Sequence, residues 1–322
     1  MALYITIDGG TTNTRVSLAD GTKILDRLSF GIGAKSNIED DTLYKSTIKE
    51  AIKKILKNNR LSENDIVRIL ASGMITSEFG LLQLEHVTVP AGIEKLHNTM
   101  KEVTIKEISD IPFVFIRGVK TGADKLENSD IMRGEETELI GIMDKSDGEC
   151  TYVLPGSHSK IIKTDTSGNI IEFSTMLTGE MLAALSQNTI LKDAVDLENS
   201  VLNKEYLLIG FDFCRKNGIN NSLFKVRILK NMFGQNKDRI YSFFLGTVLC
   251  EEIIEIIKQK PKKVVVGGRK QLKLATCEIL KNKSDAEIVC IPSEKIECAN
   301  SAGMVKIFEY RQAVLEPNMP YV

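Results

Sequence analysis

The chain has 322 residues, and its 42 lysine and arginine residues balance its 43 aspartate and glutamate residues. This balance gives no electrostatic reason to bind nucleic acid or an anionic membrane, so a small-molecule partner is the better expectation. The length predicts two lobes of similar size. No signal peptide and no apolar run long enough to cross a bilayer are recognisable, and we therefore expect a cytoplasmic protein.

The six cysteines have no CxxC spacing, and only three histidines accompany them. This pattern predicts reduced thiols and no zinc site.

The chain is expected to open with an antiparallel meander. Strands are predicted at 3–7, 15–18 and 23–30, with a hairpin turn between the last two. Residues 42–59 place apolar side chains at helical spacing opposite lysines, which indicates an amphipathic surface helix. The stretches "IVRILASGM" and "PFVFIRG" each predict a strand that ends in glycine.

The second half of the chain repeats the plan of the first. "ECTYVLPGSHSKIIKTDTSGNIIEF" again runs from an apolar strand through a glycine turn into two further strands. "KKVVVGGRKQLKLATCEIL" predicts a buried strand, a glycine turn and a helix, and a short helix is expected around 301–308. We therefore expect a hinged α/β protein with lobes at 1–146 and 147–322, mixed sheets, flanking helices and a cleft between the lobes. The tail "EPNMPYV" either returns to the first lobe or is loose.

The sequence "DGGTTN" after the first strand is a candidate phosphate loop. Glycine lets backbone amides approach an anion closely, and the hydroxyls add donors. Asp8 would be a partner for Mg2+ that bridges phosphate oxygens. A tight hairpin without a ligand is the alternative. The phosphate-binding residues expected here are Gly9, Gly10, Thr11 and Thr12.

The sequence "PGSHSK" is the second candidate phosphate loop, by its symmetry with the first, and a plain turn is again the alternative. Gly156, Ser157 and His158 are its expected ligands. Together the two loops could hold the β and γ phosphates of one nucleotide. The chain has neither a GxxxxGK[ST] loop nor a complete dinucleotide fingerprint, which argues against a P-loop NTPase and a Rossmann dehydrogenase.

The stretch "DIMRGEETELIGIM" predicts a helix with an unusual carboxylate. Glu136 falls in the same helical stripe as Met132 and Leu139, where an apolar residue is expected, and Glu135 lies at its edge. Burial would raise the pKa of Glu136 and suit it to act as a general base toward a hydroxyl. The alternative is an acidic first turn favoured by the helix dipole.

Five further residues have an open interpretation. Arg133 or Lys160 could pair with an acidic group of a substrate. Glu180, in "LTGEM", begins a helix or reaches sugar hydroxyls. Gly267 and Gly268 could let adenosine lie against the backbone, or form only a tight strand-to-helix turn.

Over residues 4–308, the chain resembles the 2-dehydro-3-deoxygalactonokinase family of the actin-like sugar kinases. The resemblance rests on four motifs in this order: "IDGGTTNTR", "MRGEETELIG", "LPGSHSK" and "LTGEM". The resemblance implies a two-lobed actin-like ATPase fold, related to ribonuclease H, and ATP-dependent phosphorylation of 2-dehydro-3-deoxy-D-galactonate on its 6-hydroxyl. It assigns the first loop, including Asn13, to phosphate, metal and substrate, and Glu136 to the base. Two departures are that the family usually carries a bulky aromatic residue at Gly9 and a less charged adenosine turn than "GGRKQ".

Two other functions stay open at this stage. One is a kinase of another sugar or keto sugar acid, and the other is a non-catalytic actin-like regulator that binds nucleotide. A homo-oligomer also stays open as an alternative to a monomer.

Overall fold

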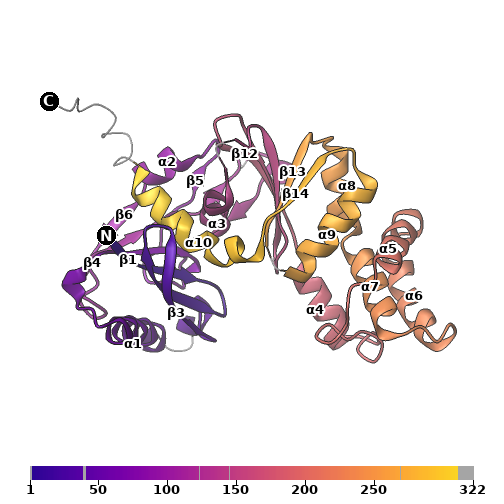
Figure 1. Ribbon diagram of the computed structural model, residues 1–322, viewed down its shortest axis with the longest axis horizontal. Helices are drawn as coiled ribbons and strands as arrows, with labels where there is room; N and C mark the ends of the chain where they lie inside the picture. The colour runs from indigo at the N-terminus through magenta and orange to yellow at the C-terminus, as the bar shows by residue number, and fades with distance from the viewer. Residues whose placement is uncertain (1, 39–40, 123, 145, 269, 311–322) are drawn as a thin grey trace. The chain divides into compact units, whose positions relative to one another are not determined.

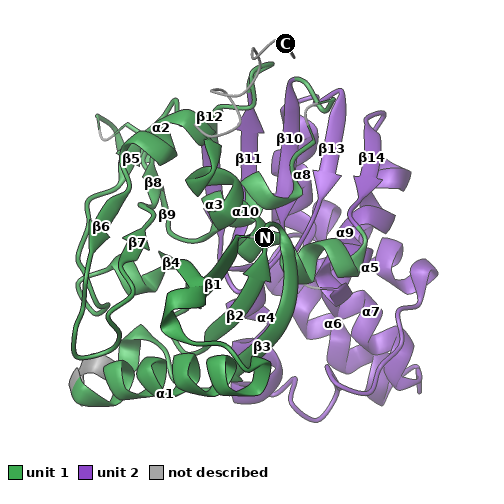
Figure 2. Ribbon diagram, turned by 60° about the vertical axis from the view of Figure 1, so that its left-hand side comes forward, with its two compact units in different colours: residues 1–148, 165–172, 292–322 green, residues 149–164, 173–291 purple. Residues whose placement is uncertain are grey.

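The computed structural model of the protein describes residues 2–38, 41–122, 124–144, 146–268 and 270–310 (Figure 1). The chain divides into two compact units, formed by residues 1–148, 165–172 and 292–322 and by residues 149–164 and 173–291 (Figure 2). This division differs from the expected lobes 1–146 and 147–322, because the last helix and the turn at 165–172 join the first unit. The tail "EPNMPYV" lies outside the described residues.

Unit 1 is built on a six-stranded sheet with the order β3-β2-β1-β4-β7-β6. The first three strands are antiparallel, as the sequence predicts, and β1, β4 and β7 run parallel. Its strands are β1 (Leu3–Gly9), β2 (Thr14–Asp20), β3 (Lys23–Phe30), β4 (Ile66–Gly73), β6 (Lys101–Val103) and β7 (Phe113–Phe115). The carboxyl ends of β1 and β4 meet at one edge, where the first candidate phosphate loop begins.

A second, three-stranded sheet in unit 1 has the order β5-β8-β9, formed by Val87–Thr88, Val119–Lys120 and Ile131–Met132. The unit's helices are α1 (Asp41–Asn59), α2 (Ile93–Asn98), α3 (Glu135–Ile142) and α10 (Ser293–Phe308), with short 3-10 turns η1 (Ala34–Ile38), η2 (Glu63–Asp65), η3 (Met74–Thr76) and η4 (Leu126–Asn128). Helix α1 matches the amphipathic helix predicted at 42–59, and its apolar face packs on the sheet. Met132 lies in β9 rather than in the predicted helix, because the positive φ of Gly134 starts α3 only after it.

Helices α3 and α10 pack closely within unit 1 (Figure 1). A Cβ on Gly141 of α3 would lie 1.8 Å from the carbonyl oxygen of Ala299, and one on Gly303 of α10 would lie 1.8 Å from that of Thr137. Only glycine permits this approach of two helix backbones. Helix α10 begins at Ser293, earlier than the short helix expected around 301–308, and this contact explains its place in unit 1.

Unit 2 contains a five-stranded sheet with the order β12-β11-β10-β13-β14, in which β10 and β11 are antiparallel and β10, β13 and β14 are parallel. The strands are β10 (Cys150–Leu154), β11 (Ser159–Thr164), β12 (Ile170–Met176), β13 (Lys263–Val266) and β14 (Glu287–Cys290). Its helices are α4 (Thr178–Asn188), α5 (Lys204–Asn217), α6 (Ile219–Asn231), α7 (Lys237–Val248), α8 (Cys250–Lys258) and α9 (Lys270–Lys283). The order of its first four strands repeats that of unit 1, so the predicted mixed α/β architecture is confirmed.

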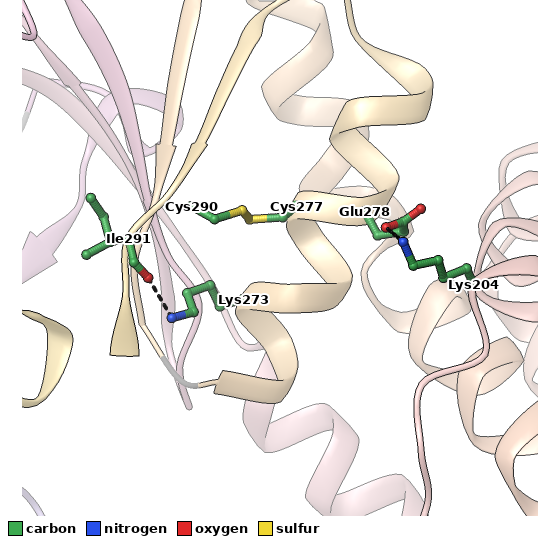
Figure 3. Close-up of a disulfide and its surroundings, with 6 residues drawn as sticks. All are labelled: Lys204, Lys273, Cys277, Glu278, Cys290 and Ile291. Carbon is green, nitrogen blue, oxygen red and sulfur yellow. Dashed lines mark hydrogen bonds and ion pairs between the residues drawn. A yellow bond between two sulfur atoms is a disulfide. The ribbon is translucent and has the colours of Figure 1, made fainter. Parts of the chain in front are cut away.

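Two cysteines of unit 2 form a disulfide, which corrects the expectation of reduced thiols throughout the chain. Cys277 lies on α9 and Cys290 ends β14, and their Cα atoms are 6.5 Å apart (Figure 3). The pairing arises because α9 packs beside β14, a neighbourhood that the separation of 13 residues does not reveal. Cys150, Cys214, Cys250 and Cys298 take part in no disulfide within the part of the chain that the structure describes.

Across the described ranges, the helices are too short or too polar to include a candidate membrane-spanning segment.

Candidate active site

The first glycine loop connects β1 to β2 and is held by backbone hydrogen bonds. The Gly10 amide donates to the Asn13 carbonyl at 2.8 Å, which closes the turn. The amides of Ala34 and Lys35 donate to the carbonyls of Gly10 and Thr11, each at 3.0 Å. The loop's carbonyls are therefore directed into the protein, while its three polar side chains at 11–13 are exposed.

Gly9 differs from the rest of this loop because it is buried. A Cβ at this position would lie 2.7 Å from both Tyr44 Oη and Ile75 Cβ. No side chain fits there, so the structure explains the departure from the aromatic residue at this position in the resembling family. Gly9 serves the packing beneath the loop, whereas Gly10 is the more accessible of the two.

Three glycines bring α3 to the end of β1. In the parallel pair β1-β4, Gly9 is opposite Gly73, and a Cβ on Gly73 would lie 2.5 Å from the Gly9 carbonyl oxygen. A Cβ on Gly134 would in turn lie 3.3 Å from the Gly73 Cα. Gly134 has φ +110°, which disfavours other residues, and it immediately precedes α3. The acidic start of α3 is therefore held beside the first glycine loop.

Asp8 ends β1 and pairs with a neighbouring cation. It is opposite Arg15 in the β1-β2 ladder, and Arg15 Nη1 donates to Asp8 Oδ2 at 2.8 Å. The Asp8 side chain keeps 23% of its surface exposed. Burial raises the pKa of Asp8 and Arg15 opposes this shift, while the charge of Glu135 adds to it. Asp8 and Glu135 are therefore close enough to interact electrostatically.

Glu136 is fully buried, as the apolar periodicity predicts. Its Oε1 and Oε2 accept from the amide of Gly134 at 2.9 and 2.8 Å. Burial raises the pKa of Glu136 to about 8, the charge of Glu135 adds to the increase, and the backbone hydrogen bonds oppose it. A carboxyl group in this position has no contact with solvent.

Glu135, the next residue back, is only partly buried. Its Oε2 accepts from the backbone amide of Arg133 at 3.0 Å, which fixes the side chain at the first turn of α3. Of the two adjacent carboxylates, Glu135 is therefore the one with surface available to a substrate.

Arg133 is mostly engaged by the protein itself. Its Nη1 donates to the carbonyl and hydroxyl of Thr76 at 2.7 and 2.6 Å, and its Nη2 donates to the carbonyl of Leu84 at 3.2 Å. The guanidinium thus holds η3 and the segment after it. These contacts leave Arg133 poorly placed to bind an acidic substrate group by itself.

The second glycine loop connects β10 to β11 in unit 2 and contacts the start of α4. A Cβ on Gly179 would lie 2.3 Å from the Gly156 carbonyl oxygen, so glycine is required there. The Glu180 amide donates to the Ser157 carbonyl at 3.2 Å. The Glu180 carboxylate lies 2.9 Å from His158 Nε2, and both side chains are exposed. The sequence-predicted residues of "LPGSHSK" and "LTGEM" are therefore brought together.

The turn after β13 also meets this loop. The Gly267 amide donates to the Val153 carbonyl at 2.8 Å, in line with the parallel pairing of β10 and β13. Gly268 has φ +72°, and a Cβ there would lie 2.3 Å from the Pro155 carbonyl oxygen. The expected adenosine turn and second phosphate loop therefore share one edge of the unit 2 sheet.

A buried carboxyl group supports the second loop from behind. Thr178 Oγ1 donates to Glu252 Oε2 at 2.5 Å, and Ser159 hydrogen-bonds the same carboxyl. Ser159 Oγ also accepts from the Gly156 amide at 3.3 Å. Burial raises the pKa of Glu252, and its hydrogen bonds oppose the shift.

Lys160 is buried in β11, with its Nζ 3.5 Å from the His158 carbonyl oxygen. This position suits support of the second loop better than contact with a substrate.

Sequence reasoning missed Arg15, Glu252 and the three-glycine contact. The antiparallel register of the hairpin β1-β2 places Arg15 opposite Asp8, so this pair could have been predicted from the sequence. An acidic residue at an apolar position of a helix predicted the burial of Glu136. The same signal is present at Glu252 in α8 and would have predicted its burial.

The fold and these loops define a class of protein. Each unit opens its sheet with a glycine-turn hairpin, and unit 1 places an acidic helix start beside that turn, as expected of an actin-like sugar kinase. A structure of a candidate 2-dehydro-3-deoxygalactonokinase from Sinorhizobium meliloti is similar, with a TM-score of 0.76 and 20% identity, and the match covers 97% of this chain and 99% of that one. Component A of the (R)-2-hydroxyglutaryl-CoA dehydratase of Acidaminococcus fermentans has a related fold, with a TM-score of 0.52, 15% identity and coverage of 98% and 100%.

The sequence profile of the 2-keto-3-deoxy-galactonokinase family matches residues 8–305. The 2-dehydro-3-deoxygalactonokinase of Escherichia coli (strain K12) is 25% identical over 257 residues, which cover 78% of this chain and 80% of that protein. The chain belongs to the 2-keto-3-deoxy-galactonokinase family. It is a sugar-acid kinase, a phosphotransferase that uses ATP and acts on a hydroxyl group.

Proposed function

We propose that the protein transfers the γ-phosphoryl group of ATP to the 6-hydroxyl of 2-dehydro-3-deoxy-D-galactonate, which gives 2-dehydro-3-deoxy-6-phosphogalactonate and ADP in galactonate breakdown. Family membership supports the substrate class. The observation that carries the chemistry is the contact of Gly9, Gly73 and Gly134, since it holds the carboxylates at the start of α3 beside Asp8 and the first glycine loop.

Glu135 accepts the proton of the 6-hydroxyl as its oxygen attacks the γ-phosphorus and the bond to the leaving ADP oxygen breaks. The partial exposure of Glu135 supports this role, and its bond to the Arg133 amide orients it. Glu136 was the first expectation for the base; its full burial, against the partial exposure of Glu135, favours Glu135. Glu136 instead acts as a positioning residue, because it binds the Gly134 amide at the turn that sets the direction of α3.

The nucleotide contacts are proposed for each unit separately. In unit 1, the loop at 10–13 contacts phosphate through the hydroxyls of Thr11 and Thr12 and through its amides other than that of Gly10, which closes the turn, and Asn13 reaches the substrate. In unit 2, the loop at 156–158 contacts phosphate and adenosine lies against the glycine turn at 267–268. The close packing of that turn on Pro155 supports a common nucleotide surface in unit 2. The exposed Glu180, oriented by His158, binds substrate hydroxyls.

Asp8 fits a magnesium ion. Mg2+ commonly uses one or two carboxylates, substrate phosphates and several waters, so a single aspartate beside a phosphate loop is a sufficient protein contribution. Arg15 occupies Asp8 Oδ2, and the partly exposed side chain offers its other oxygen. When bound, Mg2+ would neutralise charge on the transferred phosphoryl group.

The test is a coupled ADP-release assay with Mg-ATP and four conditions: 2-dehydro-3-deoxygalactonate, its gluconate epimer, plain hexoses and no sugar. We expect turnover only with the deoxy keto acids. Rapid turnover with a neutral hexose, or ATP hydrolysis that is indifferent to sugar, would contradict the proposal.

A further inference from the structure

The three-stranded sheet of unit 1 has one buried and one outward face. The alternation of side chains places Val87, Val119 and Met132 on one face, and all three are buried. The neighbouring positions therefore share the opposite face, which is hydrophilic and includes the 60% exposed Ile131. We call this opposite face the basic face; its residues are His86, Thr88, Gly118, Lys120, Ile131 and Arg133. Figure 2 shows the strands β5, β8 and β9 of this sheet within unit 1.

A glycine in the middle of the basic face lets two nitrogen-rich side chains approach each other. A Cβ on Gly118 would lie 2.8 Å from His86 Cδ2 and 3.2 Å from Arg133 Cα. Without that side chain, Arg133 Nη2 comes within 3.4 Å of His86 Nδ1. The row across the three strands is therefore His86, an empty central position and Arg133.

This contact determines which ring nitrogen of His86 carries the proton. Burial and the charges of Arg133 and Lys120 lower the pKa of His86 to about 4, so the ring is neutral at physiological pH. Since the guanidinium can only donate, Nδ1 of the neutral ring must accept, and Nε2 then bears the hydrogen. His86 thus presents an N–H donor beside two cations.

Lys120 and Arg133 supply the charge of the basic face. Lys120 is partly exposed, and its ammonium group has no hydrogen bond or ion pair among the residues that the structure describes, while its carbonyl accepts from the Val89 amide at 2.9 Å. The positive charges of Arg133 and Lys120 both act on His86, as the lowered pKa of His86 indicates. Two cations next to an N–H donor are suited to bind a carboxylate.

The basic face continues directly into the acidic start of α3. Arg133 ends the row, and Glu135 follows two residues later, so their Cα atoms are at most about 7 Å apart. A six-carbon open-chain acid has its carboxylate and its terminal hydroxyl at its two ends, about this far apart. A carboxylate bound at the Arg133 end of the basic face would therefore leave the terminal hydroxyl within reach of Glu135.

We propose that the basic face binds the carboxylate of the sugar-acid substrate, through Lys120 Nζ and His86 Nε2, with Arg133 as the residue that positions His86 and adds charge. The inference rests on the proposed function and identifies how that site selects an acid over a neutral sugar. Arg133 thereby affects binding of the carboxylate through its contact with His86 and through its charge.

The test compares wild type with Lys120→Met, Lys120→Arg and His86→Phe, using 2-dehydro-3-deoxygalactonate and its neutral amide as substrates. We expect Lys120→Met to raise the KM for the acid about 10- to 100-fold, the loss expected for a charge-assisted hydrogen bond, with the KM for ATP unchanged. The KM for the amide should hardly change, so the variant loses discrimination between acid and amide. Lys120→Arg should recover most of it, and His86→Phe should raise the KM for the acid in the same direction.

Lys125→Met is the matched control, because Lys125 is exposed in the same part of unit 1 but outside the basic face. Thermal melting of each variant checks folding. If wild type phosphorylates the acid and Lys120→Met keeps both its KM and its acid preference, the inference is wrong while the proposed function stands. If wild type phosphorylates no deoxy keto acid, the proposed function fails and the inference fails with it.

Discussion

The buried carboxyl group of Glu136 predicts a specific dependence of stability on pH. In the unfolded chain Glu136 releases its proton near its ordinary pKa of 4.5, whereas the folded chain keeps it up to about 8. Between these values the folded state binds more protons, so the free energy of unfolding falls as pH rises. The contribution is fully present below pH 4.5 and is lost as the pH rises through 8.

The magnitude follows from the pKa difference. Each pKa unit corresponds to about 1.4 kcal/mol, so the increase from 4.5 to about 8 means that, relative to pH 4.5 and below, about 3 kcal/mol of stability is lost at pH 7 and about 5 kcal/mol above pH 8. Glu136→Gln removes the titration, because the amide resembles the protonated acid at every pH. Relative to wild type, the variant should therefore gain about 3 kcal/mol between pH 4.5 and pH 7.

Urea unfolding at several pH values measures this difference. Far-UV circular dichroism is the appropriate signal because the chain has no tryptophan. The exposed Glu127→Gln serves as the control and should follow the wild-type profile. A constant offset between Glu136→Gln and wild type across this pH range would refute the reasoning, since it would mean that Glu136 titrates alike in both states.

Three further predictions concern the reaction and the two units. Glu135→Gln should lower kcat by about 10²- to 10⁴-fold, and a nucleotide titration should show that nucleotide binding is retained. A larger loss of kcat in Glu136→Gln than in Glu135→Gln would mean that Glu136 is the base. Gly179→Ala should raise the KM for ATP, because its Cβ would lie 2.3 Å from the Gly156 carbonyl oxygen; an unchanged KM in steady-state kinetics would remove that loop from the nucleotide site. Reduction of the Cys277–Cys290 disulfide should lower the free energy of unfolding by about 3 kcal/mol, since it opens a loop whose ends are 13 residues apart. Urea unfolding with and without reductant measures this, and a Cys277→Ala/Cys290→Ala variant that responds equally to reductant would contradict it.

Local patterns in the sequence were sufficient for much of the architecture. The strand-turn-strand openings of both units, the helix at 42–59 and the burial of Glu136 depend on the alternation or the helical spacing of neighbouring residues. The glycine turns were recognisable because few residues other than glycine allow such close backbone approach. The roles proposed for the loops remain predictions.

The tertiary structure decided how distant segments meet. The helix α3 begins beside the first loop because three glycines that are far apart in the sequence come into close contact. They are Gly9, Gly73 and Gly134. The return of α10 to unit 1 and the contact of Cys277 with Cys290 likewise depend on helix packing.

Accessibility was also a tertiary property. Helical spacing predicted the burial of Glu136, but only the tertiary packing shows that the adjacent Glu135 keeps exposed surface. In the same way, residues within and beside the strands β5, β8 and β9 form one basic face only because these strands pair. A local pattern reports the direction of a side chain relative to its own element, whereas its chemical surroundings depend on which other elements pack against it.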